Sequence, residues 1–287
     1  MASKIKIPIK TIKLMKSSVL GDYQGVNKDP EFGAINQFNV QRVNERYNNL
    51  IKELKLKEIK KQKILEIGSG SGLFIAYLRK KGIEAYGIEP DKKSYDASKI
   101  LLRENKLNFN IKNSDGEKIP FKKEFFDVVI SFQVIEHTKN PFLVLKESKR
   151  VLKKGGHIYF VVPNYHSFWE GHYRIIWFPF FNKFFAKIYV RILGRNASFI
   201  DTLQFITPKK IKLWTKELNL KVINLGEENF RKNLCEEKIK EYWSGNKFLG
   251  NIIKFIRKFC LDKFMSWLFI KFDFYYPLIL VAKKDKT

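Results

Sequence analysis

The sequence has little cysteine, few acidic residues and no long apolar run. Its two cysteines, Cys235 and Cys260, exclude a disulfide framework and a four-thiolate zinc site. No stretch approaches the roughly 18 uninterrupted apolar residues of a membrane-spanning helix, and no apolar core of signal-peptide length follows Lys16. We therefore expect a cytoplasmic protein, with peripheral attachment to the inner face of the membrane as an open alternative.

The shortage of acidic residues leaves a strongly basic chain. Fifty-five Lys and Arg against 29 Asp and Glu give a formal charge of +26 in 287 residues. Such a charge is typical of proteins that bind nucleic acid or anionic lipid. However, only 10 of these residues are Arg, the side chain that phosphate and base-edge recognition favours. The excess is also positive in each of the ranges 1–63, 64–162, 163–229 and 230–287, so a Lys-rich solvated surface explains it equally well.

Short apolar segments alternate with helical ones over the central part of the chain. Strands are predicted at 63–67, 84–88, 109–113, 126–132 and 157–162, and helices at 34–61, 73–81, 94–105, 141–152 and 207–220. This alternation implies right-handed crossovers, and two further segments, 221–225 and 276–282, could close the sheet edge. The sequence predicts an α/β fold with a doubly wound, Rossmann-like sheet of seven mostly parallel strands and an antiparallel edge strand.

Two aromatic-rich segments interrupt this order. They cover about 164–206 and 230–273 and are expected to form helical insertions. We interpret the chain as an N-terminal helical extension or lid, residues 1–62, followed by one ligand-binding domain, residues 63–287, that carries both insertions.

The sharpest motif is ILEIGSGSG, residues 64–72. A strand that runs into Gly68, Gly70 and Gly72 and then into a helix forms a tight turn, where backbone amides can face a ligand. Position 73 is Leu rather than the third glycine of the dinucleotide fingerprint, and no Lys-Ser/Thr pair closes a P-loop. The motif thus indicates a different ligand, with a purely structural turn as the alternative.

Two carboxylates follow at the ends of the next predicted strands. Glu89 lies 23 residues after Glu66, where a carboxylate can accept hydrogen bonds from both ribose hydroxyls. Asp115, in NSDGEKIPF, is placed to accept from an adenine amine. Each could alone be a surface or turn residue, but their order along the strands predicts a nucleoside site.

These segments together resemble the class I S-adenosylmethionine-dependent methyltransferases. The similarity is greatest to the branch with the ubiquinone-biosynthesis O-methyltransferases and bacterial sugar and secondary-metabolite methyltransferases, and it covers about residues 40–165. ILEIGSGSG resembles the first motif of the family, GIEP the acidic position of the second strand and SDGEKIPF the adenine-contact motif. FFDVVISFQVIEHTKNP and LKKGGHIYFVVPN resemble the fourth and fifth strand motifs.

The resemblance implies S-adenosyl-L-methionine as cofactor and a set of residues that bind it. The methionine moiety would be lined by Glu66, Gly68, Ser69, Gly70 and Gly72, the ribose bound by Glu89, and the adenine held by Asp115 and Gly116. Gln133, just past the fourth strand, would lie near the methionine end.

Two histidines are candidates for a catalytic base. Methyl transfer from a sulfonium depends mainly on positioning and exclusion of water, but a hydroxyl acceptor also benefits from a base. His137, in VIEH, follows the fourth strand, and packing or helix capping is its alternative role; His172, in WEGHY, is the second candidate. Quinone O-methyltransferases of this branch bind a divalent metal through Glu–x–x–Glu–His. Gln133 replaces the first carboxylate here, so we expect no metal.

The insertions contain two predicted amphipathic helices. On 179–194 one face carries Phe181, Phe184, Phe185, Ile188 and Ile192 and another Lys183, Lys187 and Arg191; on 247–261 the apolar set is Phe248, Ile252, Phe255, Ile256 and Phe259. Such helices could cover the substrate cleft or pack in the core, bind a membrane surface, or form a dimer interface. An apolar cap would suit an amphipathic acceptor.

We therefore predict a methyltransferase that methylates an oxygen of a small-molecule, glycan-precursor or lipid-linked acceptor. The alternatives are a quinone-type enzyme at the membrane surface, and a non-catalytic cofactor-binding or basic nucleic-acid-binding protein on the same fold. Nucleic acid is not expected, because SFQV stands where base-amine methyltransferases carry Asn/Asp-Pro-Pro-aromatic. Both cysteines also lie in the second insertion, away from the position of a catalytic nucleophile.

Overall fold

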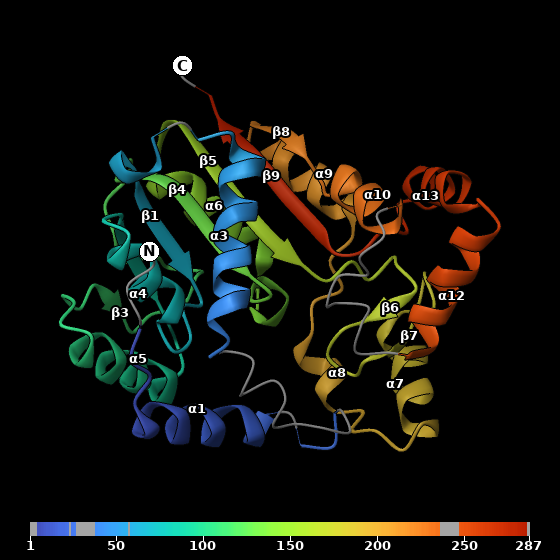
Figure 1. The fold of residues 1–287 in the computed structure, drawn as a ribbon, viewed down its shortest axis with the longest axis horizontal. Helices are drawn as coiled ribbons and strands as arrows, with labels where there is room; N and C mark the ends of the chain where they lie inside the picture. The colour runs from blue at the N-terminus through green and yellow to red at the C-terminus, as the bar shows by residue number, and fades with distance from the viewer. Residues whose placement is uncertain (1–4, 23, 27–37, 57, 236–246, 286–287) are drawn as a thin grey trace.

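A seven-stranded sheet forms the centre of the computed structural model, which describes residues 5–22, 24–26, 38–56, 58–235 and 247–285 (Figure 1). The strands are β1 (Lys63–Ile67), β2 (Glu84–Ile88), β3 (Ile111–Lys112), β4 (Phe126–Phe132), β5 (Leu152–Val162), β8 (Leu220–Asn224) and β9 (Leu278–Lys284). Their order across the sheet is β3-β2-β1-β4-β5-β9-β8. The predicted fold class is confirmed. The antiparallel strand is β9, which lies one place inside the edge strand β8.

The register brings the carboxyl ends of the central strands level. Ile67 at the end of β1 pairs with Ile88 at the end of β2 and with Ser131 near the end of β4. The loops that follow these three strands therefore emerge at one edge of the sheet, which is where open α/β sheets bind ligands.

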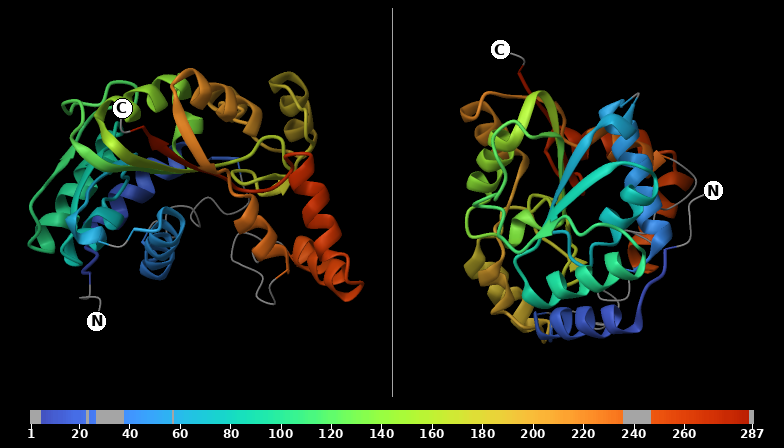
Figure 2. Two further views of the ribbon diagram at one scale, coloured as in Figure 1. Left: turned by 90° about the horizontal axis from the view of Figure 1, so that it is seen from above. Right: turned by 90° about the vertical axis from the view of Figure 1, so that its left-hand side faces the viewer.

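Helices cover both faces of the sheet, and the central strands are therefore buried on both sides (Figure 2). They are α4 (Leu73–Lys80), α5 (Lys92–Glu104), α6 (Pro141–Val151) and α9 (Pro208–Glu217). Side-chain caps fix where three of them begin: Asp91 accepts from the amide of Ser94, Asn140 from that of Leu143 and Thr207 from that of Lys210.

The N-terminal part packs against this layer through two helices. The first, α1 (Ile9–Asp22), lies along α5, where the Ser18 hydroxyl donates to Asp91 (2.9 Å). The second, α3 (Val40–Leu54), packs on α4, where the Tyr77 hydroxyl donates to Asn44. The helix predicted over 34–61 thus appears as α3 and a 3-10 turn, Ile59–Lys61, while 34–37 lies outside the described residues. The sequence did not predict α1.

Both aromatic segments form small additions at one end of the molecule. The first contains β6 (Trp169–Glu170), β7 (Ile175–Ile176), α7 (Lys183–Ile192) and α8 (Phe199–Thr202), around a core of its own that includes Tyr173 and Trp177. The second region contains α10 (Glu227–Cys235), α12 (Lys247–Lys258) and α13 (Asp262–Lys271). None of the described helices is long and apolar enough to cross a membrane.

Candidate active site at the carboxyl edge of the sheet

The loop between β1 and α4 is built from glycines in a left-handed conformation. Gly68, Gly70 and Gly72 have φ values of 69°, 51° and 73°. A Cβ atom on Gly68 would lie 2.5 Å from the side chain of Val134. The amides of Gly68 and Ser69 donate to the Ile88 carbonyl, at 2.9 and 3.0 Å. These contacts hold the loop between the ends of β2 and β4 and explain why glycine occupies these positions.

Glu89 reaches back to this loop from the end of β2. Its Oε2 accepts from the Gly70 amide (2.8 Å) and its Oε1 from the Asp91 amide (3.0 Å). Burial raises the pKa of Glu89 to about 7, against the opposing effect of these two amides. A carboxylate has about four acceptor sites, so Glu89 keeps capacity for hydroxyl donors of a ligand.

Glu66 lies beneath the loop with an unsatisfied oxygen. Its side chain is buried, and Oε2 has no hydrogen-bond partner among the described residues. Burial raises its pKa to about 8, the Arg46 guanidinium opposes the rise and Glu89 adds to it. Ser69 Oγ is likewise buried without a described partner. Two buried polar atoms without a described partner, next to the glycine loop, fit a polar, cationic ligand such as the methionine end of S-adenosylmethionine.

Arg46 was not predicted from the sequence as a site residue. It extends from α3, its guanidinium lies 4.7 Å from the ring centroid of Phe132, and its charge lowers the pKa of Glu66. The N-terminal extension, residues 1–62, therefore contributes a positive charge near the glycine loop. The helical pattern of its sequence does not by itself indicate this role.

The remaining predicted cofactor residues lie at the same edge but differ in their surroundings. Asp115 is exposed, and its Oδ1 accepts from the amides of Glu117 and Lys118, at 3.1 and 3.0 Å, so it forms the turn that was its alternative role. Gly116 is buried, and a Cβ there would lie 3.0 Å from Ile67 at the end of β1. Gln133 is exposed in a left-handed conformation (φ 56°), and its amide donates to the Val161 carbonyl at 2.7 Å.

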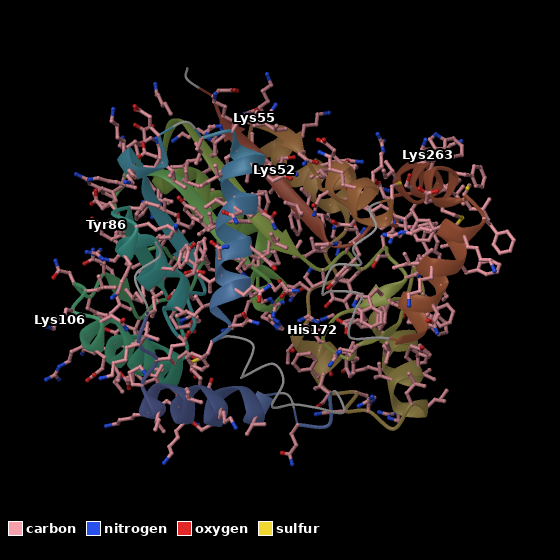
Figure 3. The ribbon with its side chains drawn as sticks, viewed as in Figure 1. Lys52, Lys55, Tyr86, Lys106, His172 and Lys263 are labelled. Carbon is pink, nitrogen blue, oxygen red and sulfur yellow. The ribbon has the colours of Figure 1, made fainter. Side chains whose placement is uncertain are left out.

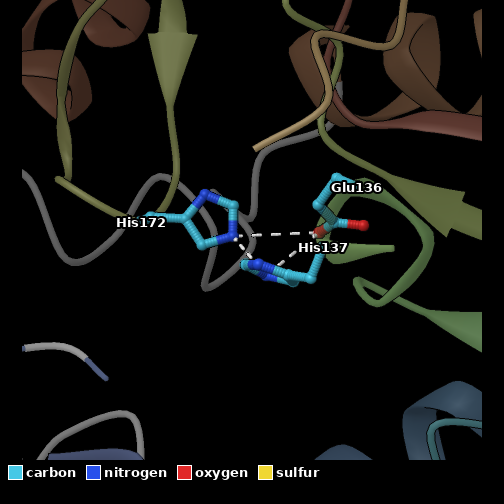
Figure 4. Close-up of side chains that lie close together, drawn as sticks. All are labelled: Glu136, His137 and His172. Atoms are coloured by element: carbon cyan, nitrogen blue, oxygen red, sulfur yellow. Dashed lines mark hydrogen bonds and ion pairs between the residues drawn. The ribbon is translucent and has the colours of Figure 1, made fainter. Parts of the chain in front are cut away.

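The two candidate histidines contact each other although 35 positions separate them. His137 lies in the 3-10 turn Ile135–His137 after β4, and His172 follows β6 in the first insertion. Their Nε2 atoms are 3.1 Å apart (Figure 4). His172 Nδ1 lies 2.7 Å from Glu170 Oε1. Figure 3 places His172 between the sheet and the insertion helices. The His137 amide donates to the carbonyl of Val134, the residue packed against Gly68, so the pair lies one turn from the glycine loop.

Two buried carboxylates determine the electrostatics of this pair. Burial alone would lower the pKa of His172, but Glu170 and Glu136 raise it above its ordinary value. Burial and the neighbouring His172 lower the pKa of His137, whose side chain is 29% exposed. Burial raises the pKa of Glu136 to about 7, with His172 opposing. A proton shared by the pair is therefore stabilised on His172, between the two glutamates.

Comparison with known proteins agrees with the geometry of the glycine loop and strand ends. The family model of the methyltransferase domain matches residues 65–160. The chain is 31% identical over 138 residues to a ubiquinone biosynthesis O-methyltransferase of Pelagibacter ubique, covering 47% of this chain and 57% of the relative. Residues 65–160 thus form a class I S-adenosylmethionine-dependent methyltransferase domain. Its cofactor is S-adenosyl-L-methionine, as the motifs predicted.

Further relatives of the methyltransferase domain extend the similarity along the chain. A ubiquinone biosynthesis O-methyltransferase of Coxiella burnetii is 25% identical over 183 residues, which cover 62% of this chain and 74% of the relative. A solved S-adenosylmethionine-dependent methyltransferase of Mesorhizobium loti matches the fold with a TM-score of 0.51 and 13% identity, over 80% of this chain and 94% of that one. The chain thus spans just over half the length of the first relative and about three quarters of the second.

Two carboxylates beside the histidine pair were not predicted from the sequence. They are Glu170 and the buried Glu136. Glu136 has both oxygens buried without a described hydrogen bond, and its Oε1 lies 3.8 Å from His172 Nε2 and 4.0 Å from His137 Nε2. Ligand atoms of these three side chains all lie within 4.8 Å of one another, a donor set that suits a divalent cation. The expectation that this chain binds no metal therefore stays a prediction. The arrangement of these three side chains is an observation against it.

Proposed function

We propose that this chain transfers the methyl group of S-adenosylmethionine to a hydroxyl oxygen of a small-molecule or lipid-linked acceptor. The observation that carries the proposal is the chain of contacts from Glu170 through His172 to His137, one turn from the glycine loop. A base of this kind serves an acceptor that must lose a proton, as a hydroxyl does. Relatives whose names specify O-methylation support the choice of oxygen.

The residues of the chain divide the work between binding and proton transfer. When bound, the cofactor supplies a methyl group on a sulfonium sulfur, which leaves as a neutral thioether. Glu66 and Ser69 would bind its methionine end beside the glycine loop, and Glu89 would accept from its ribose hydroxyls. Positioning of this kind supplies much of the rate when the leaving group is already activated.

Proton transfer would run along the histidine pair. With His172 Nδ1–H donating to Glu170, the Nε2 lone pair of His172 accepts from Nε2–H of His137, which leaves Nδ1 of His137 to take the acceptor proton. The charge that develops is stabilised because Glu170 and Glu136 both raise the pKa of His172. Glu170 and His172 act here as positioning residues, in the way that a carboxylate orients a histidine base.

A second mode of activation is favoured by the buried oxygens of Glu136, which have no described hydrogen bond. A divalent cation held by Glu136, His137 and His172 would polarise the acceptor hydroxyl, and Glu170 would then orient His172 as a ligand. Dialysis against a chelator separates the two modes. Unchanged methyl transfer supports the base, whereas loss of transfer that Mg²⁺, Mn²⁺ or Zn²⁺ restores supports the cation.

The proposal is tested by cofactor binding and turnover in matched variants. Calorimetry with S-adenosylmethionine comes first, followed by release of S-adenosylhomocysteine with sugar, polyhydroxylated aromatic, quinone-type and lipid-linked acceptors. We expect His137→Asn to lower kcat about 100-fold, the lower end of the range for a general base, with cofactor Kd unchanged. His157→Asn on β5, away from this edge, is the control.

Three outcomes would contradict parts of the proposal. Full turnover by His137→Asn would remove the base and leave the methyltransferase. Tight cofactor binding without product from every acceptor would favour a non-catalytic cofactor-binding protein. A steep loss of affinity for duplex DNA or RNA with rising salt would favour the nucleic-acid alternative.

A further inference from the structure

Helix α7 exposes its large apolar side chains and buries its small ones. Ala186 and Val190 are the buried residues of the helix, whereas Phe184, Ile188 and Ile192 are exposed, Ile192 by 77%. A surface helix normally turns its largest apolar side chains toward the core. The apolar face predicted for this helix is therefore not a core face, because the insertion packs through the opposite side.

Helices α12 and α13 also expose large apolar side chains. On α12 only Ile253 is buried among the residues whose side chains are described, and Phe255 is 60% exposed; Phe259, directly after the helix, is 55% exposed. On α13 Ser266 is buried and Met265, Phe269 and Ile270 pack against the core, whereas Phe264 and Trp267 are exposed. Single exposed apolar residues need no explanation, but three neighbouring helices that each expose two or more large apolar side chains do.

These faces belong to one end of the molecule. Figures 1 and 2 show α7, α12 and α13 at the end away from β1 and β2. Ring contacts join the two insertions there: Phe168 packs on Phe269, and Phe180 on Phe274. Of the large apolar side chains exposed in the described ranges, all but Ile9, Val40, Leu213 and Ile223 belong to the two insertions.

The charge of the same helices selects among the partners that such a surface could have. The three helices carry nine Lys and Arg, and Asp262 is their one acidic residue. A twofold dimer would bring this patch against itself and place like charges together. Nucleic acid would use the Lys residues and stack on some rings, but it would leave Ile188, Ile192 and Ile252 without a partner.

We propose that α7, α12 and α13 form a docking face for an anionic phospholipid bilayer. Phe and Trp side chains would enter the interface between headgroups and acyl chains, while exposed basic residues such as Lys254 and Lys258 contact lipid phosphates. Lys271, which lies 4.8 Å above the Trp267 ring, and Lys263, labelled at the rim of α13 in Figure 3, are placed for this role. The inference does not rest on the proposed methyl transfer, since it concerns a surface outside the cofactor site.

Vesicle sedimentation of the full chain tests the docking face. The probes are vesicles of phosphatidylcholine alone and of phosphatidylcholine with about one third phosphatidylglycerol. We expect binding to the anionic vesicles only. Phe184→Gln with Ile188→Gln, and Phe255→Gln with Phe259→Gln, should each lower the partition coefficient about tenfold or more. Lys254→Glu with Lys258→Glu should lower it about 20-fold or more, because each Lys near the surface contributes about fivefold.

Matched controls distinguish binding through these three helices from binding that depends only on net charge or on exposed apolar residues elsewhere. Leu213→Gln with Ile223→Gln removes exposed apolar residues outside the insertions, and Lys60→Glu with Lys123→Glu makes the same charge change elsewhere on the surface. Both should keep binding within about threefold, and circular dichroism with cofactor calorimetry confirms that each variant folds.

Three results would overturn the proposal. One is a wild-type chain that does not sediment with anionic vesicles. Another is equal loss of binding in the control and helix variants, which would show that binding follows net charge alone. The third is a wild-type dimer that the Phe variants convert to monomer without any change in vesicle binding, which would assign the face to self-association.

Discussion

Replacement of Glu66 by Gln should stabilise the cofactor-free protein at neutral pH while it abolishes cofactor binding. Glu66 is buried beneath the glycine loop, and its pKa is raised to about 8 from an ordinary value of 4.5. Between these two values the folded protein holds a proton on Glu66 that the unfolded chain has released. Folding stability therefore falls as pH rises through this window, and Gln removes that fall.

The magnitude follows from the slope of the linkage. One proton corresponds to about 1.36 kcal/mol per pH unit, so between pH 5 and pH 7 the free energy of unfolding of the wild type should fall by about 2–3 kcal/mol more than that of Glu66→Gln. Glu89 is present in both proteins, so the difference between the two curves isolates Glu66.

Urea unfolding followed by circular dichroism at pH 5, 6, 7 and 8 measures this difference. Glu58→Gln, at an exposed carboxylate paired with Lys61, serves as the control and should change stability by less than about 0.5 kcal/mol at every pH. Parallel curves for the wild type and Glu66→Gln would refute the reasoning, because they would show that Glu66 is ionised in the folded protein. Calorimetry in two buffers adds a second readout: a cationic cofactor that ionises Glu66 should release a proton on binding at pH 7.

Three further predictions follow from the same edge of the sheet. Gly68→Ala should destabilise the chain by about 1–3 kcal/mol in urea unfolding, because the added Cβ meets the methyl groups of Val134. A second substitution, Val134→Ala, should restore part of this loss, and no restoration would contradict the packing. Glu89→Gln should raise the cofactor Kd at least tenfold in calorimetry, and an unchanged Kd would show that the carboxylate only holds the loop. The kcat/KM of the wild type should rise with pH as the histidine pair loses its proton, and Glu170→Gln should move that rise to lower pH, because Glu170 raises the pKa of His172; a rise that stays in place would contradict the positioning role.

The sheet and its ligand edge could be predicted because they are encoded in short, local patterns. The run Phe126–Phe132 is apolar throughout, as a strand covered on both faces must be, and the structure makes it β4 at the centre of the sheet. The glycine loop, Glu89 and Gly116 come together because parallel strands in register end level. Helix α1 was missed because its sequence has only a weak apolar stripe, and its contacts with α5 are tertiary.

The histidine cluster could be predicted only in part. The sequence identified His137 and His172 separately, but nothing local shows that a chain reversal in the first insertion brings their Nε2 atoms together. Glu170 was overlooked because it is one glutamate in WEGHY, and its role depends on burial and on a contact with His172. The helix predicted over 179–194 forms as the shorter α7, Lys183–Ile192, whereas its exposed apolar face depends on which side the insertion packs.

The position of β9 has a consequence for synthesis of the chain. Strand β9 pairs with β5 on one side and β8 on the other, so β8 has no sheet neighbour until residues 278–284 have left the ribosome. During translation β5 therefore keeps an unpaired edge after the cofactor-binding strands are complete, and such an edge is prone to association with other chains. A nascent chain stalled before Leu278 should for this reason depend on chaperones, even though every residue of the glycine loop and of the histidine pair has already been made.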